Sequence, residues 1–137
     1  MLLTASASQN TTINSLNYPS NYYDNMECTW RVKIEDKINF PFGDYVLKVI
    51  FNDFELEAEQ ASSFPSCPYD GLKFYDGDSE SSPVLGSYCG TVHPEVIYST
   101  RSNLYVKFYT DGHSTFRGFS IGVSVVEAGT DIKYCHM

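Results

Sequence analysis

The sequence lacks any apolar run long enough to cross a membrane as a helix. Its best apolar stretch, Tyr45–Phe51, has seven residues and contains Lys48, whereas a span needs about 20. Positive charge is also scarce, because nine Lys and Arg face 17 Asp and Glu, a formal net charge of −8. This balance excludes nucleic acid as a partner and disfavours anionic membranes and heparin-like polymers. It suits divalent cations or basic partner surfaces instead.

Cysteine and histidine are few, and they are not spaced as metal ligands. The chain has three His, and no two of its four Cys are separated by two residues, as in zinc knuckles or redox motifs. We therefore expect two disulfides and an oxidising compartment. The acceptor motif Asn10-Thr11-Thr12 predicts N-glycosylation of Asn10. Both observations indicate a secreted protein or the ectodomain of a cell-surface protein.

The sequence also lacks a recognisable catalytic arrangement. No Ser stands in a Gly-x-Ser-x-Gly setting, and the interior histidines, His93 and His113, fall in expected loops. We expect no enzymatic activity.

What the sequence does contain is alternation of apolar and polar residues, which is typical of β-strands. No segment has helical spacing, and Pro, Gly, Asn and Asp separate the strands. Strands with one apolar face must bury that face against a second sheet. The sequence therefore predicts an all-β, antiparallel, two-sheet β-sandwich. The clearest alternating segments are 29–34, 45–51, 72–74, 104–109 and 119–125.

Several local motifs follow one another in a distinctive order. They are Asn17-Tyr18-Pro19-Ser20-Asn21-Tyr22, Cys28-Thr29-Trp30, Phe51-Asn52-Asp53-Phe54-Glu55-Leu56-Glu57, Cys67-Pro68-Tyr69-Asp70, Phe74-Tyr75-Asp76-Gly77, Gly86-Ser87-Tyr88-Cys89-Gly90, Pro94, Ile97-Tyr98-Ser99, Leu104–Phe108, Asp111 and Gly118-Phe119. Together, and in this order, they resemble the CUB domain, and the resemblance runs from about Ile13 to Val126.

The resemblance implies a jelly-roll-like sandwich that serves as an extracellular interaction module, with a disulfide between Cys67 and Cys89. The family's usual first cysteine, ahead of the Asn-Tyr-Pro segment, is missing here, and Cys135 is left over. We expect a Cys28–Cys135 bridge. The alternative is that Cys135 pairs outside this domain while Cys28 stays free.

The expected organisation has three parts. Residues 1–12 are expected to be a leader remnant or an artificial end of the chain, because they end in small residues but lack a basic start. Residues 13–126 are expected to form the sandwich. Residues 127–137 lose the alternation and are expected to form a C-terminal tail.

Three carboxylates are candidates for a metal site. Glu57 follows one expected strand, Asp70 precedes the next, and Asp111 follows the strand at 104–109. Strand ends and strand starts of opposite direction meet at one pole of an antiparallel sandwich, so these side chains can converge. Like charges at one place repel unless a cation intervenes. Calcium takes six to eight oxygen ligands from loops of this kind, whereas zinc prefers His or Cys.

The resemblance adds roles at the same positions. In the calcium-binding subset of CUB domains these carboxylates are the ligands, joined by a backbone carbonyl that maps onto His113, and a tyrosine that maps onto Tyr22 orients them. The loaded pole often receives a Lys or Arg from a partner, so Glu57 and Asp111 are expected to serve both ion and partner. The predicted function is a non-catalytic module for calcium-dependent protein–protein binding within a larger secreted or cell-surface protein.

The alternative is a lectin-like, single-domain secreted protein that binds carbohydrate. Some single-domain CUB relatives bind glycans, and Tyr75, Tyr105 and Tyr109 are expected on outer sheet faces, where rings can stack on sugars. Tyrosine also suits half-buried strands without any ligand. Trp30 alternates with Val32, so we expect it to belong to the core.

Overall fold

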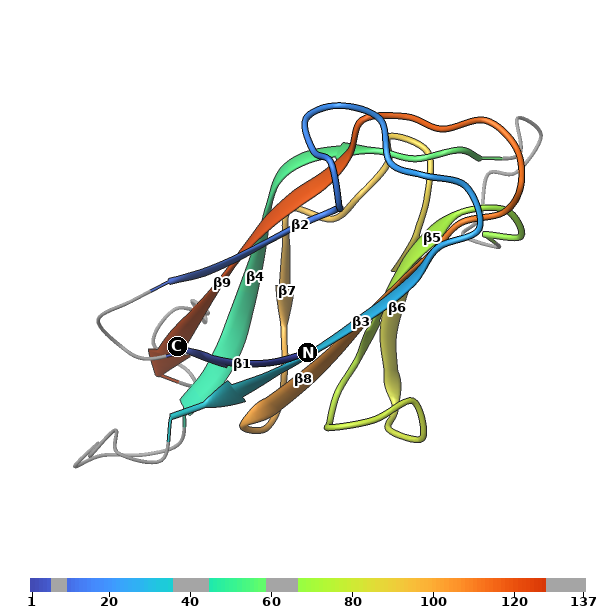
Figure 1. The fold of residues 1–137 in the computed structure, drawn as a ribbon. Coiled ribbons are helices and arrows are strands. Elements are labelled where there is room, and N and C mark those ends of the chain that lie inside the picture. The colour runs from blue at the N-terminus through green and yellow to red at the C-terminus, as the bar shows by residue number, and fades with distance from the viewer. Residues whose placement is uncertain (6–9, 36–44, 59–66, 128–137) are drawn as a thin grey trace, which may run out of the picture.

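The residues that the structure describes form nine strands and no helix, and the five alternating segments all lie within strands (Figure 1). The structure is a computed structural model that describes residues 1–5, 10–35, 45–58 and 67–127. The strands are β1 Leu2–Ala5, β2 Thr11–Asn14, β3 Glu27–Ile34, β4 Tyr45–Glu55, β5 Gly71–Tyr75, β6 Val84–Tyr88, β7 Val96–Tyr98, β8 Asn103–Tyr109 and β9 Gly118–Glu127. Across these ranges no helix is long and apolar enough to span a membrane.

Two sheets stack face to face, as Figure 1 shows. The five-stranded sheet has the order β1-β3-β8-β5-β6, and the four-stranded sheet has the order β2-β9-β4-β7. Every pairing is antiparallel except that of β1 with β3. The predicted two-sheet sandwich is therefore confirmed.

The core lies between the sheets and is rich in aromatic rings. Phe108 of β8 and Phe119 of β9 meet edge to face across the layers, with ring centroids 5.1 Å apart. Trp30 packs against Phe119 at 6.0 Å and is partly buried, so it belongs to the core as expected. Burying each such side chain contributes about 1.5–3 kcal/mol.

The N-terminal residues join the sandwich ahead of Ile13. Strand β1 pairs in parallel with β3, Leu2 beside Arg31 and Ala5 beside Ile34. Ala5 is only 2% exposed, so β1 covers one edge of the core. Four residues are too short a run to show alternation clearly, and their composition is similar to the end of a signal peptide. Glu127, the first residue of the expected tail, is the last residue of β9. The rest of the expected tail, 128–137, lies outside the described residues.

The cysteines are partly accounted for. Cys67 and Cys89 form the expected disulfide. Cys28 has no disulfide partner among the described residues, and burial raises the pKa of its thiol there. Its expected partner, Cys135, lies outside the described residues, so the Cys28–Cys135 bridge stays a prediction. Asn10 is exposed just ahead of β2, and its glycosylation also stays a prediction.

Candidate metal centre

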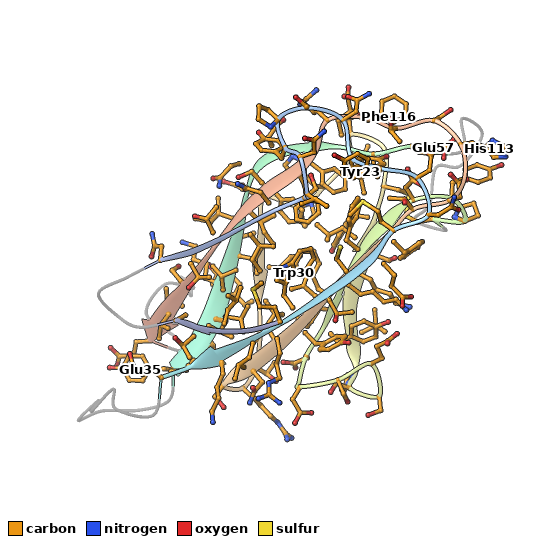
Figure 2. All side chains as sticks on the ribbon, viewed as in Figure 1. Tyr23, Trp30, Glu35, Glu57, His113 and Phe116 are labelled. Atoms are coloured by element: carbon orange, nitrogen blue, oxygen red, sulfur yellow. A yellow bond between two sulfur atoms is a disulfide. The ribbon has the colours of Figure 1, made fainter. Side chains whose placement is uncertain are left out.

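The ends of three strands bring Glu57, Asp70 and Asp111 together. Glu57 lies two residues beyond β4, Asp70 directly precedes β5, and Asp111 lies two residues beyond β8. One carboxylate oxygen from each lies within 4.8 Å of the other two. We call this cluster the acidic pole. Glu57 and His113 are seen at that end of the sandwich in Figure 2.

Asp70 is the buried centre of the acidic pole. Its side chain has no exposure. One oxygen accepts a hydrogen bond from the hydroxyl of Tyr22, and the other accepts the backbone N–H of Asp111 at 2.8 Å. Burial raises the pKa of Asp70, although both hydrogen bonds oppose that rise. Two directions of approach are thus already occupied by donors that fix the carboxylate plane.

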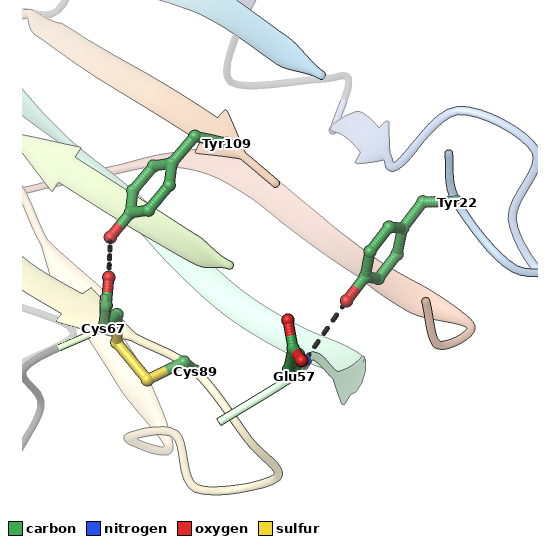
Figure 3. The surroundings of a disulfide bond; sticks show 5 residues. All are labelled: Tyr22, Glu57, Cys67, Cys89 and Tyr109. Carbon is green, nitrogen blue, oxygen red and sulfur yellow. Dashed lines mark hydrogen bonds between the residues drawn. A yellow bond between two sulfur atoms is a disulfide. The ribbon is translucent and has the colours of Figure 1, made fainter. Parts of the chain in front are cut away.

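Tyr22 connects the carboxylates to the core. It is 2% exposed, and its ring meets Phe108 edge to face at 5.2 Å. Its hydroxyl oxygen accepts the backbone N–H of Glu57 at 3.1 Å (Figure 3). The same hydroxyl donates a hydrogen bond to Asp70. Burial raises its pKa well above the usual value, so the hydroxyl keeps its proton. Tyr22 thus contacts both Asp70 and Glu57, and its role in orienting metal ligands stays a prediction.

Asp111 lies in the loop that joins β8 to β9. One of its carboxylate oxygens accepts the backbone N–H of His113 at 3.0 Å, and its carbonyl accepts the N–H of Asn25 at 2.8 Å. Burial works to raise the pKa of Asp111, but the hydrogen bonds that it accepts, beginning with the one from His113, hold it below its usual value. The side chain of His113 is exposed, and the role expected for its carbonyl stays a prediction.

Glu57 carries a buried carboxylate oxygen, Oε1, that has no hydrogen-bond donor among the described residues. Burial and the adjacent Asp111 raise the pKa of Glu57 to about 6. A buried carboxylate oxygen without a donor is costly unless a proton or a cation satisfies it.

The disulfide braces the segment that carries Asp70. Tyr109 donates a hydrogen bond to the carbonyl of Cys67 at 2.7 Å, next to the Cys67–Cys89 bridge (Figure 3). The Tyr109 ring covers Gly71 so closely that a Cβ at position 71 would collide with it. The absence of a side chain at Gly71 therefore lets Tyr109 hold this segment in place.

Two other carboxylates near the acidic pole are already neutralised. Asp53 forms a two-point ion pair with Arg117, at 2.7 Å and 2.6 Å, and accepts the Tyr18 hydroxyl at 2.7 Å. Glu55 lies 3.2 Å from the same guanidinium. Arg117 is 64 positions from Asp53, so no local motif in the sequence indicated this ion pair. Asp53, Glu55 and Glu57 alternate along the chain, and the first two are paired with Arg117. Among the described residues, Glu57 has no such ion pair and can contact another cation.

The tyrosines considered for sugar stacking are largely covered. Tyr75 is 5% exposed and packs against Tyr105 at 5.7 Å, with the Lys73 ammonium 5.4 Å from its ring centre. The Tyr109 hydroxyl is engaged by Cys67. All three lie on the outer face of the five-stranded sheet, as expected, but Tyr75 offers no open ring face to a sugar.

The donor set of the acidic pole consists of carboxylate oxygens, without His or Cys. Such hard oxygen donors fit calcium, and backbone carbonyls and water would complete its six to eight ligands. They do not form the nitrogen or sulfur set that zinc prefers. The partnerless Oε1 of Glu57 is consistent with the same fit.

Comparison with known sequences gives a family. The family model described as CUB domain matches residues 4–122. Tolloid-like protein 2 of Mus musculus is 33% identical over 122 residues, which cover 89% of this chain and 11% of that protein. Bone morphogenetic protein 1 of Xenopus laevis is 37% identical over 109 residues, covering 80% and 14%. The chain thus spans a small fraction of the relatives it matches.

Solved structures agree with this result. The crystal structure of the MASP-1 CUB2 domain bound to Ca²⁺ aligns with a TM-score of 0.70 and 26% identity, over 90% of this chain and 96% of that one. The full extracellular region of zebrafish Gpr126/Adgrg6 aligns with a TM-score of 0.72 and 25% identity, over 93% and 15%.

Proposed function

The chain belongs to the CUB domain family, a type of non-catalytic protein-interaction module, and we propose that it binds calcium at the acidic pole. With calcium bound, the acidic pole holds a basic side chain of a partner protein. Glu57, Asp70 and Asp111 supply carboxylate ligands, and the carbonyl of His113 supplies a further oxygen. We further propose that the chain is part of a larger secreted or cell-surface protein.

The observation that carries the calcium proposal is the crowding of three carboxylates around an unsatisfied oxygen. Their oxygens lie within 4.8 Å of one another, and Glu57 Oε1 has no donor among the described groups. A divalent cation would neutralise two of the three charges. The calcium stated for the MASP-1 CUB2 domain, which shares the fold, supports the proposal.

The partner proposal rests on the charge that remains. Three carboxylates and one calcium leave a net charge of about −1, and Glu57 and Asp111 are only half-buried. Their outer oxygens can accept charge-assisted hydrogen bonds from an ammonium or guanidinium group. Such a contact is screened by salt and weak by itself, so tight binding needs several copies.

Calcium binding is tested by calorimetry on chelator-stripped protein. We expect one saturable site in the unaltered chain and none in Asp111→Ala. Glu35→Gln removes one exposed charge at the opposite end of the sandwich (Figure 2) and should bind as the unaltered chain does. Absence of binding in the unaltered chain would overturn the proposal.

Partner recognition is tested by NMR titration with two capped peptides that differ only in lysine against norleucine. Norleucine keeps the alkyl chain and removes the ammonium. We expect amide shifts at residues 57–58 and 110–113 with the lysine peptide, in calcium but not in chelator. Equal shifts with both peptides would contradict a charge-based contact.

A further inference from the structure

The outer face of the five-stranded sheet carries positive charge, although the protein is acidic. Inward-facing Val32, Leu72 and Val106 are fully buried, so the residues on either side of each point outward. Four of the seven Lys and Arg that the structure describes lie on this face, and Glu27 is its one carboxylate on β3, β5 or β8. We call these four the basic face: Arg31, Lys33, Lys73 and Lys107.

Strand register places two of these cations against each other. Lys73 of β5 lies directly opposite Lys107 of β8. Like charges at directly opposed positions destabilise a sheet. Lys107 is partly compensated by Glu80 at 2.7 Å and Glu27 at 3.3 Å. The Lys73 ammonium has only its aromatic contact with Tyr75 among the described groups. Departures from a local stability rule often mark functional surfaces.

Arg31 supplies a second uncompensated cation. It lies on β3, opposite Tyr105 of β8. Its Nε is buried and has no hydrogen-bond partner among the described residues. Since β3 and β5 flank β8, Arg31 and Lys73 are two strand spacings apart, about 10 Å across the sheet. Two separated cations of this kind suit a ligand with repeated negative groups.

The face favours a polyanion that lies across it. Strands β3, β8 and β5 each have a neighbour on both sides, so a peptide cannot add to them as a further strand. Hydroxyl and amide groups lie directly opposite three of the cations, Tyr105 opposite Arg31, Asn103 opposite Lys33 and Thr29 opposite Lys107. Sulfate accepts several hydrogen bonds at once from guanidinium, ammonium and hydroxyl donors, and it keeps its charge at any physiological pH.

We propose that the basic face binds a sulfated polysaccharide, with Arg31 and Lys73 as the principal contacts. The overall charge of −8 argues against such a ligand, but it adds together the charges of the acidic pole and of the basic face, which are different parts of the surface. Glu27, 68% exposed, and Glu80, 49% exposed, border the face and neutralise much of Lys107. Binding is therefore selective for ligands that reach Arg31 and Lys73, and it is sensitive to salt.

The test uses a heparin-derived hexasaccharide and its desulfated counterpart, titrated calorimetrically into the full chain in chelator at 50 and 150 mM salt. Chelator keeps the acidic pole without calcium, so the outcome is independent of the proposed calcium function. Arg31→Gln and Lys73→Gln should each weaken binding about threefold to fivefold, and the double variant at least tenfold. Lys48→Gln removes one charge from the other sheet and should leave binding within twofold.

Several outcomes would overturn the proposal. They are no binding at 50 mM salt, equal binding of the desulfated sugar, or an equal loss in Lys48→Gln. A hexaglutamate peptide that binds as tightly as the sulfated sugar would also overturn it and assign the face to an acidic protein. The variants should stay folded, because Lys73→Gln removes a repulsion and should keep or raise the melting temperature.

Discussion

The backbone N–H of Glu57 donates a hydrogen bond to the hydroxyl oxygen of Tyr22 at 3.1 Å. The same hydroxyl donates to Asp70, so one buried ring fixes two of the proposed ligands. The geometry of the acidic pole therefore depends on a side chain that would not itself touch an ion.

Replacing Tyr22 by Phe tests this dependence. The change keeps the ring in the core but leaves the Glu57 N–H and one Asp70 oxygen without their partner. We expect a loss of about 1–3 kcal/mol in the free energy of unfolding, because buried polar groups without partners are costly. Urea denaturation in chelator measures the loss, and calorimetry should show weaker calcium binding. An unchanged calcium affinity would show that Tyr22 does not position the ligands.

Calcium affinity should fall in acid. The pKa of Glu57 is raised to about 6, so at pH 5 a proton competes with the ion for this carboxylate. One competing proton predicts an affinity about tenfold lower at pH 5 than at pH 7. Calorimetry at both values measures this change. A constant affinity over that range would contradict ligation by Glu57.

The metal-free protein should show the opposite trend in stability. A carboxyl whose native pKa lies above its unfolded value takes up a proton more readily in the folded state. Stability in chelator should therefore rise as the pH falls from 7 toward about 4.5, the unfolded value of Glu. Thermal unfolding in chelator measures this rise, and Glu57→Gln should reduce it. A flat profile in the unaltered chain would contradict the raised pKa.

Arg117→Gln should destabilise the fold more than Lys107→Gln does. Each change breaks contacts to two carboxylates, but Arg117 holds Asp53 by two parallel bonds and also contacts Glu55. We expect a larger loss in the free energy of unfolding for Arg117→Gln than for Lys107→Gln, because a two-point contact is geometrically better defined than single exposed ion pairs. Chemical denaturation at pH 7 measures both, and equal losses would contradict a special role for the Arg117 fork.

The pH dependence of that contact has a defined sign. The Arg117 guanidinium holds the pKa of Asp53 well below its usual range. The contribution of this ion pair to the free energy of unfolding is therefore complete above the unfolded pKa of Asp, about 3.9, and it is lost as the pH falls further. The difference between the unaltered chain and Arg117→Gln should shrink below about pH 4.

Peptide mapping without reduction tests the remaining disulfide. We expect a cross-linked peptide pair that contains Cys28 and Cys135, and no labelling of Cys28 by an alkylating reagent in the native protein. The known pair, Cys67 with Cys89, serves as the internal control. Labelling of native Cys28 would exclude the bridge and favour pairing of Cys135 elsewhere.

Much of the candidate site could be predicted because it follows from strand periodicity. Once the alternation predicts strands, Glu57, Asp70 and Asp111 fall at strand ends that share a pole, and the structure places them together. The Cys67–Cys89 disulfide was predicted from the family resemblance and is present. Neither inference needs side-chain packing.

Other features depend on register and could not be predicted. The ion pair of Asp53 with Arg117 joins residues 64 positions apart, and no local pattern links them. The opposition of Lys73 and Lys107 follows only from how β5 aligns with β8. The net charge of the chain gave no indication of the basic face, because a sum of charges says nothing about where the charges lie.

The three proposed ligands come from different layers of the sandwich. Glu57 follows β4 of the four-stranded sheet, while Asp70 and Asp111 adjoin β5 and β8 of the five-stranded sheet. An ion held between them would therefore cross-link the two layers at this pole, in addition to the packing of the core. Removing the ion would weaken the connection between the sheets as well as the ligand site itself.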